Sequence, residues 1–209
     1  MPKSRTRKGC KTQSGGGFKP ADETSLEKGR RLNIIIAGVV AILAVALAFY
    51  WWDLGETKRE FLVLALKGKG ALSQVTNERS LGGGHLRPGQ TRTYTSQFPT
   101  SGSHHRTPTE PGYYETHQPP IHLVHALEHG HIVIYYDKPD AKALKTLRVW
   151  SGLYSGQWDG VVVTPKPGLG QKIVLTAWAK RLDQSQLDMP LAAAFIDAFR
   201  GRGPENPVR

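Results

Sequence analysis

Cysteine is almost absent from this 209-residue chain, whose single cysteine, Cys10, precedes the first long apolar segment. One cysteine excludes an internal disulfide, a thiolate-rich metal site and, beyond position 10, a cysteine nucleophile. Because Cys10 lies before the apolar segment, it is not a lipoprotein cysteine, which would follow such a segment. Any metal or catalytic site in the rest of the chain is therefore built from nitrogen and oxygen atoms.

Acidic residues are also scarce, with 17 Asp and Glu against 28 Lys and Arg and a formal net charge of +11. Residues 1–31 hold nine of the basic residues and three of the acidic ones. A basic tail of this kind can bind nucleic acid. An uncharged apolar segment follows the tail, so we interpret the tail as a topology signal that contacts lipid headgroups. We therefore predict no nucleic-acid partner. The Gly, Ser and Lys content of the tail predicts disorder.

Charge is absent altogether from residues 32–52, LNIIIAGVVAILAVALAFYWW. About 20 apolar residues, each rising ~1.5 Å along a helix, cross the hydrocarbon core of a bilayer, and the aromatic cluster at 49–52 is typical of the membrane interface. Because Arg30 and Arg31 flank the opposite end, the positive-inside rule places the N-terminus in the cytoplasm. We predict a single-pass protein of the inner (plasma) membrane, with a periplasmic or extracellular C-terminal domain and with lipid contacts through 32–52.

The alternative interpretation of this segment is a cleaved signal peptide, because ALA at 46–48 resembles a cleavage site. The long basic region, and an apolar stretch that exceeds the usual ~7–15 residues, favour a retained anchor. The predicted division is a disordered basic cytoplasmic tail (1–31), a transmembrane helix (32–52), a membrane-proximal linker (53–84), an α+β extracytoplasmic domain (85–205) and a short tail (206–209).

Apolar periodicity predicts an α+β fold with a short β-sheet for the part after the membrane. Residues 53–69 suit a short helix or strand, and 68–120 suit loops with a strand at 91–98. Helices are expected at 121–129, ending at Gly130, at 139–154, and from 189 to Gly201. Strands are expected at 131–136, 160–165 and 172–179, and a hairpin-like turn at 166–171 separates the last two.

Several phrases occur in the order known from one bacterial family of membrane-anchored proteins: SGSHHRTP, GYYE, LVHALEHG, VVVTPKPGL, LTAWAK and FIDAFRGRGPE. Over residues 85–205 the chain resembles the domain of unknown function 3105 family. It departs from the family pattern at Ser103, where the family has proline in an SGPH motif, and at 112–120, GYYETHQPP. The family has no established activity, so the resemblance implies the anchor and the domain boundary but no chemistry.

Histidines are concentrated in residues 122–136, HLVHALEHGHIVIYY. On a helix His125 and His129 are four residues apart, so their rings lie about 6 Å from each other on one face and can share a metal ion. His104 is the next candidate ligand, and His85 the fourth. Imidazole and carboxylate ligands without sulfur suit Zn²⁺ or Cu²⁺. Four further histidines are secondary or lie outside the expected site: His105, His117, His122 and His131.

The same residues allow a site without metal. In that interpretation His129 stabilises the carboxyl end of the helix electrostatically, and His125 is a hydrogen-bonded core histidine.

A second alternative is enzymatic. HALEH matches the H-x-x-E-H motif of inverted zinc peptidases, in which Glu128 would activate water and a carboxylate far downstream would complete the zinc site. Glu205 lies far enough downstream, but in a Gly/Pro-rich tail.

A third alternative is structural. A small anchored domain can serve as an accessory or scaffold subunit that binds a membrane-protein partner through exposed aromatic residues. The candidates for such an interface are Tyr113, Tyr114, Trp150, Tyr154 and Trp158. The alternative is that most of these aromatic residues belong to the core.

Overall fold

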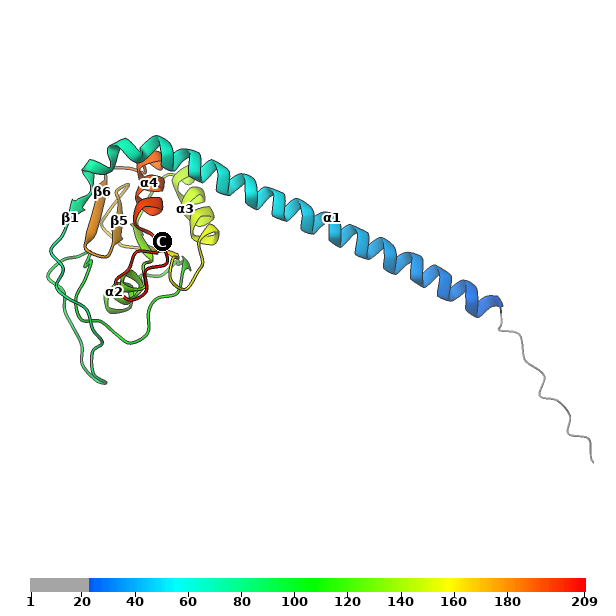
Figure 1. Cartoon of the computed structure of the whole chain (residues 1–209), viewed down its shortest axis with the longest axis horizontal. Helices are drawn as coiled ribbons and strands as arrows, with labels where there is room; N and C mark the ends of the chain where they lie inside the picture. Colours follow the sequence, from blue (N-terminus) through cyan, green and yellow to red (C-terminus); the bar gives the residue numbers. More distant parts are fainter. Residues whose placement is uncertain (1–22) are drawn as a thin grey trace, which may run out of the picture. The chain divides into compact units, whose positions relative to one another are not determined.

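The computed structural model describes residues 23–209 (Figure 1). The described chain divides into two compact units between Trp51 and Trp52. Most of the predicted basic tail, with Cys10, lies outside the described residues. Helix α1 (Glu23–Gly68) begins in the first unit and ends in the second. It is the one helix within residues 23–209 that is long and apolar enough, by length and composition, to cross a membrane.

Helix α1 does not end where the apolar segment ends. Residues 53–68 contain Leu, Glu, Lys and Ala, which favour helix, and the whole helix contains no proline. The second unit therefore starts with a helical segment rather than a strand. Phe61 and Ala65, one turn apart on that segment, are buried in the domain core. A 3₁₀ turn, Lys69–Gln74, follows.

Within the second unit the strands form one mixed six-stranded sheet in the order β1-β6-β5-β3-β4-β2. Strand β4 is parallel to β3 and β2, and the pairs β3–β5, β5–β6 and β1–β6 are antiparallel. The strands are β1 (Thr76–Asn77), β2 (Gly112–Tyr113), β3 (Ile132–Tyr136), β4 (Val161–Pro165), β5 (Ile173–Ala177) and β6 (Lys180–Gln184). A mixed sheet with helices confirms the predicted α+β class.

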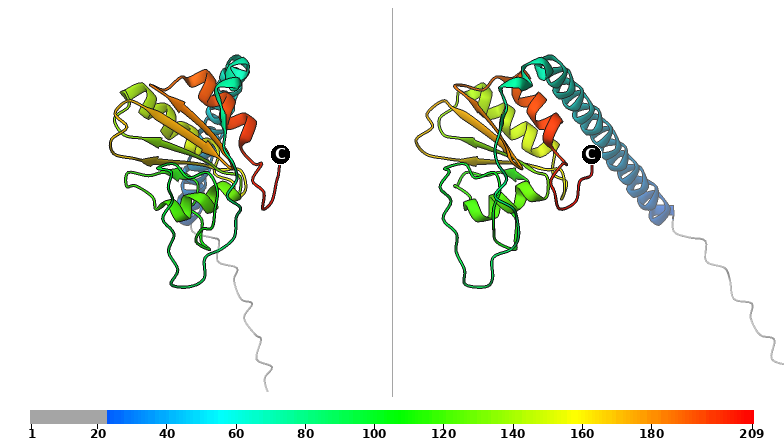
Figure 2. Two further views of the ribbon diagram at one scale, coloured as in Figure 1. Left: turned by 90° about the vertical axis from the view of Figure 1, so that its left-hand side faces the viewer. Right: turned by 60° about the vertical axis from the view of Figure 1, so that its left-hand side comes forward.

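Helices cover both faces of the sheet (Figure 2). Helices α3 (Ala141–Leu153) and α4 (Met189–Phe199), with the end of α1, lie on one face, and α2 (Pro120–Glu128) lies on the other with the long loops. Asp140 and Asp188 start α3 and α4 as N-caps, because their carboxylates accept hydrogen bonds from the Ala143 and Leu191 amides. The three helices predicted in the domain are confirmed.

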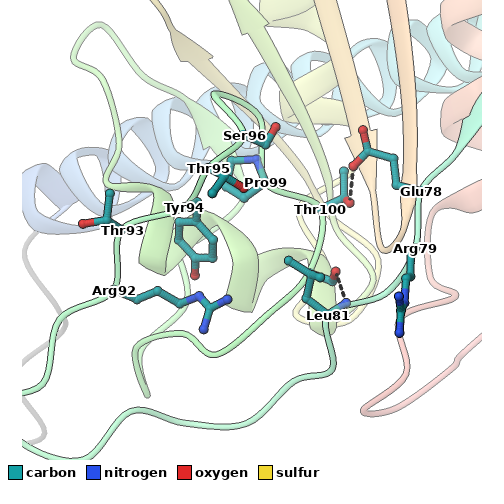
Figure 3. A pocket seen from close by; sticks show the side chains of 11 residues that line it. Glu78, Arg79, Leu81, Arg92, Thr93, Tyr94, Thr95, Ser96, Pro99 and Thr100 are labelled. Atoms are coloured by element: carbon teal, nitrogen blue, oxygen red, sulfur yellow. Dashed lines mark hydrogen bonds between the residues drawn. The ribbon is translucent and has the colours of Figure 1, made fainter.

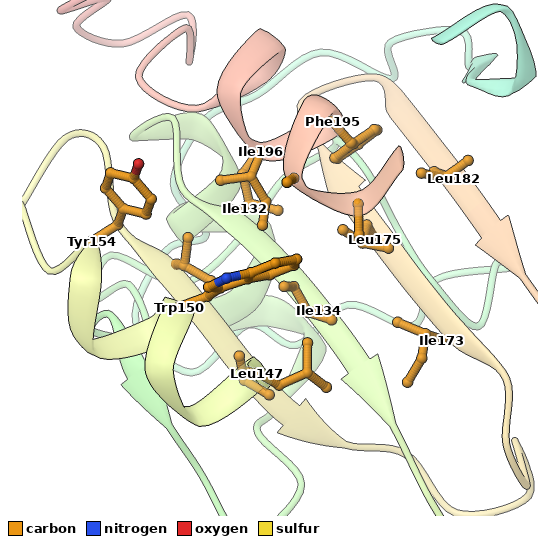
Figure 4. Packing of buried hydrophobic residues seen from close by; sticks show 14 of the residues in the cluster. Ile132, Ile134, Leu147, Trp150, Tyr154, Ile173, Leu175, Leu182, Phe195 and Ile196 are labelled. Carbon is orange, nitrogen blue, oxygen red and sulfur yellow. The ribbon is translucent and has the colours of Figure 1, made fainter. Parts of the chain in front are cut away.

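Strand β3 lies at the centre of the core because its side chains alternate between the two apolar layers. Ile132 and Ile134 pack against Trp150 of α3 and Ile196 of α4 (Figure 4). Val133 and Tyr135 point to the opposite face, where they pack under Leu123, Ala126 and Leu127 of α2. Helix α2 is therefore held to the sheet by its apolar side, and its other side is left for the histidines.

The prediction that a hairpin-like turn joins strands at 160–165 and 172–179 as neighbours in the sheet is wrong, because β3 lies between β4 and β5. Helix α3 supplies the crossover that parallel strands need, so β4 pairs with β3. The segment after β4 then crosses the end of β3, where the amides of Gly168 and Gly170 donate to Asp137, and β5 pairs with the free edge of β3.

Two other segments differ from the prediction. Residues 91–98 form no strand, and only 95–98 are bends. Strand β6 has no counterpart in the prediction, because its sequence, KRLDQ, is mostly polar and lacks an apolar pattern. In the structure only Leu182 and Gln184 of its side chains are buried.

Candidate metal centre

The end of helix α2 carries three of the functional candidates, and its geometry is set by Gly130. With φ +96°, Gly130 adopts the left-handed conformation, its amide donates to Leu127 O (3.0 Å), and the next amide, that of His131, donates to Ala126 O (2.9 Å). These two bonds form a Schellman motif, which ends the helix at His129 and turns the chain into β3. Glu128 and His129 are thereby held on the last turn.

The C-terminal tail packs onto this turn through glycines. The Gly201 amide donates to Gly130 O (2.8 Å), and the Glu205 amide lies 3.3 Å from Glu128 O. A Cβ at Gly203 would overlap the Glu128 carbonyl and the Gly130 backbone, so only glycine permits this approach. The close packing brings the Glu205 carboxylate to His129, although the two residues are far apart in sequence.

Two loop segments, 81–86 and 101–104, supply the remaining histidines by pairing in a short ladder. The Gly102 amide donates to Gly82 O (2.8 Å), the His104 amide to Gly84 O (3.0 Å), and the Leu86 amide to His104 O (2.7 Å). His85 and His104 are therefore direct neighbours, as bridge partners, and their ring centroids lie 5.3 Å apart.

Leu81 and Ser101, at the start of the two paired segments, line a small cavity of about 150 Å³ (Figure 3). Tyr94, which lines the cavity, donates from its hydroxyl to Ser103 O (2.7 Å), and the Arg92 guanidinium lies 5.4 Å above its ring. Burial raises the pKa of Tyr94 to about 12, so the hydroxyl keeps its proton. At the same end Ser101 Oγ accepts from the Leu81 amide (2.9 Å). These contacts fix the loop that ends in His104.

Hydrogen bonds to backbone carbonyls determine which nitrogen of three imidazoles carries the proton. The Nδ1 atom of His104 lies 2.8 Å from Gly102 O, that of His125 2.8 Å from His105 O, and that of His129 3.3 Å from Gln157 O. Carbonyl oxygens only accept, so Nδ1 is the donor in each ring, and Nε2 of the neutral ring has a free lone pair. The same arrangement orients metal-binding histidines in proteins.

The three Nε2 atoms face carboxylates. His104 Nε2 lies 2.9 Å from Glu128 Oε2, and Glu205 Oε2 lies 3.1 Å from His129 Nε2 and 3.7 Å from His125 Nε2. Among the described residues, two groups have ligand atoms that all lie within 4.8 Å of one another: His85, His104, His125 and Glu128, and His125, His129 and Glu205. Either group is able to hold a metal ion.

Two of these nitrogen atoms are buried near a carboxylate without a hydrogen bond. Within residues 23–209, Nε2 of His104, a residue that is 0% exposed, and Nε2 of His125, a residue that is 3% exposed, have no hydrogen-bond partner. The His104–Glu128 distance suits a hydrogen bond, but the ring does not aim an N–H at the carboxylate. Buried polar atoms without partners are costly. Burial, with smaller effects of His129 and His104, lowers the pKa of His125 to about 4, so this ring is neutral at pH 7.

The structure brings together all four predicted histidine ligands, which come from a loop (His85), the SGSH turn (His104) and helix α2 (His125 and His129). Glu128, the predicted water-activating residue, contacts His104 instead of standing apart as a free base. Glu205 joins the site, although the sequence suggested it only through the peptidase motif. The sequence feature that could have pointed to Glu205 is its position in GRGPE, directly after the glycine-rich end of the last helix.

The other histidines do not join either ligand group. His105 and His122 pack together with ring centroids 4.4 Å apart, and His117 Nδ1 lies 2.7 Å from Pro165 O. His131 is buried next to Gln157, and burial lowers its pKa to about 4.

The aromatic residues expected to bind a partner are not all exposed. Trp150 and Tyr154 are buried in the core beside Phe61, so their assignment as interface residues is wrong. Trp158 is partly buried, with its ring centroid 4.2 Å from that of His129.

Comparison with known proteins gives one family. A family model described as "Protein of unknown function (DUF3105)" matches residues 85–209, which is more than half of the chain. No curated protein and no solved structure matches the chain. The matched region contains every ligand candidate described above. The chain belongs to the DUF3105 family of proteins of unknown function.

Proposed function

We propose that this protein is a membrane-anchored metal-binding protein whose C-terminal domain binds a divalent transition metal ion. The binding site is the histidine cluster, defined as His85, His104, His125, His129, Glu128 and Glu205. One observation carries the proposal: three imidazoles, each with Nδ1 beside a backbone carbonyl, turn their Nε2 atoms toward two carboxylates, and Nε2 of His104 and of His125 is buried without a hydrogen-bond partner within residues 23–209.

The donor atoms select the class of metal. Neutral imidazoles with carboxylates suit Zn²⁺ and Cu²⁺, and the sequence offers no thiolate near the cluster for a soft ion such as Cu⁺. A positive ion bound by both groups would also offset the cost of keeping the Glu128 carboxylate next to the buried His104, whose Nε2 lies 2.9 Å from Glu128 Oε2. We therefore propose Zn²⁺ or Cu²⁺ as the bound ion.

The proposed anchor is the apolar part of α1, residues 32–52, with the N-terminus in the cytoplasm and the metal-binding domain in the periplasm or outside the cell. The uncharged segment, its aromatic end and the arginines at its other end support this orientation. We propose divisions at residues 31, 52, 84 and 205, in which the segment 53–84 packs onto the domain through Phe61, Ala65 and strand β1. Cys10 is the sole cysteine, so its labelling by a membrane-impermeant maleimide in intact cells would contradict this orientation.

Zn²⁺ binding by the full chain, purified in detergent without a polyhistidine tag, tests the proposed function. We expect saturable binding in a chelator-competition titration, and the same affinity in the His117→Ala variant, because His117 lies outside both ligand groups. Failure of the wild-type chain to bind Zn²⁺ or Cu²⁺ more tightly than an unrelated protein of similar charge would refute the proposal.

A further inference from the structure

The six donors of the histidine cluster do not surround a single point. They form two groups that share only His125, and the donor atoms are within 4.8 Å of one another inside each group but not across the whole set. A metal ion with bonds of about 2.0–2.2 Å to nitrogen and oxygen can contact only donors that lie within about 4.4 Å of one another. One ion at this geometry therefore leaves part of the cluster unused.

His125 cannot belong to two ions at once. Its Nδ1 proton is donated to His105 O (2.8 Å), which leaves one lone pair, on Nε2. One carboxylate oxygen, Glu205 Oε2, is near both His125 and His129. It lies 3.7 Å from His125 Nε2 and 3.1 Å from His129 Nε2. These three donors form a complete set of two imidazoles and one carboxylate, which is a ligand set known for catalytic zinc.

Assigning His125 to this set leaves a second set of the same composition. His104 Nε2 lies 2.9 Å from Glu128 Oε2, and the His85 ring lies 5.3 Å from the His104 ring. We infer that the cluster holds two divalent ions, an outer ion bound by His125, His129 and Glu205 and an inner ion bound by His85, His104 and Glu128. This inference rests on the proposed function and adds the number and division of the ions.

Charge supports the division, since each divalent ion receives one carboxylate and neither ion has only neutral ligands. Each set combines buried imidazole with one exposed residue: His104 is fully buried and His85 is exposed in the inner set, and His129 is buried and the Glu205 side chain is 39% exposed in the outer set. With three protein ligands and an exposed edge, each ion keeps a coordination position for water or a small ligand, as open zinc sites do. Two-ion sites with a short metal–metal distance are common in proteins.

Two tryptophans lie beside the two sets and allow them to be followed separately. The Trp158 ring lies 4.2 Å from that of His129 in the outer set. Trp178 lies beside the inner set, because a Cβ on Gly83 would touch both its ring (3.4 Å) and the Glu128 carboxylate. Cu²⁺ quenches the fluorescence of nearby indoles. In the Trp158→Phe variant the remaining Trp178 reports binding of Cu²⁺ to the inner set, and in the Trp178→Phe variant the remaining Trp158 reports binding to the outer set.

The test counts ions per chain by equilibrium dialysis and elemental analysis of the full chain in detergent, with Zn²⁺ and, separately, Cu²⁺ as probes. We expect two ions in the wild-type chain, one in Glu128→Gln and one in Glu205→Gln. His85→Ala, a change in an exposed loop residue, should also leave one ion. In Cu²⁺ titrations, Glu205→Gln should reduce quenching in the Trp178→Phe background and preserve it in the Trp158→Phe background.

One ion in the wild-type chain, weakened equally by Glu128→Gln and Glu205→Gln, would overturn the two-ion inference and leave the proposed function intact. No bound ion in the wild-type chain would overturn both. Circular dichroism identifies any variant that fails to fold, and in that case the His85→Ala count alone decides between one ion and two.

Discussion

Replacing His125 by alanine should lower the affinity for the Zn²⁺ ion held with His129 and Glu205 by at least about 100-fold, since a change in a residue that merely supports a ligand already costs 10–100-fold. His125 is the one residue common to both ligand groups, and its neutral ring offers Nε2 from a buried position. Competition with a chelator of known affinity measures the change.

The matched control is His117→Ala, which removes an exposed imidazole that is also next to a backbone carbonyl. It should leave the affinity unchanged. Because His125 is buried, its loss also leaves a cavity, so the unfolding free energy of the metal-free variant has to be measured beside the affinity. A folded His125→Ala variant that binds every Zn²⁺ ion of the wild-type chain with affinities within threefold would contradict its role as a ligand.

The Gly203→Ala variant should lower the free energy of unfolding by about 3 kcal/mol, at the upper end of the cost of forcing atoms into a packed site. The added methyl group would overlap the Glu128 carbonyl and the Gly130 backbone, neither of which can rotate away as a side chain can. If the tail moves to relieve the overlap, Glu205 leaves His129. Weaker Zn²⁺ binding is then expected together with the lower stability.

Chemical denaturation and the Zn²⁺ titration measure these two effects. The control is Gly152→Ala in α3, where an added Cβ would meet nothing within 4 Å, so its stability should equal or exceed that of the wild-type chain because alanine favours helix. Equal stability of the Gly203→Ala and Gly152→Ala variants would show that the tail is not packed onto α2.

Local patterns were enough to predict the helical part of the site. His125 and His129 share a face of α2 because of their spacing, and Gly130 ends the helix because its left-handed conformation excludes most other residues. The apolar residues Leu123, Val124 and Leu127 give the helix its buried side. Each of these features depends on neighbours within four residues, which is the range that sequence periodicity describes.

Long-range pairing was less predictable. The ladder that joins 81–86 to 101–104 consists of backbone hydrogen bonds between glycine-rich segments without periodicity, so nothing in the side chains specified that His85 would meet His104. Glu205 depends on glycine–glycine packing between the tail and α2. The order of β4 and β5 depends on which edge of β3 stays free, a property of the whole sheet.

X-ray absorption spectroscopy of the Zn²⁺-loaded full chain, prepared without a polyhistidine tag, examines the ligands of the proposed metal centre themselves. We expect nitrogen and oxygen ligands at about 2.0–2.2 Å, the outer-shell scattering of coordinated imidazole rings, and fewer bound ions and coordinated imidazoles per chain in His125→Ala. A spectrum with oxygen ligands alone, unchanged by the His125→Ala substitution, would contradict a histidine metal centre in this domain.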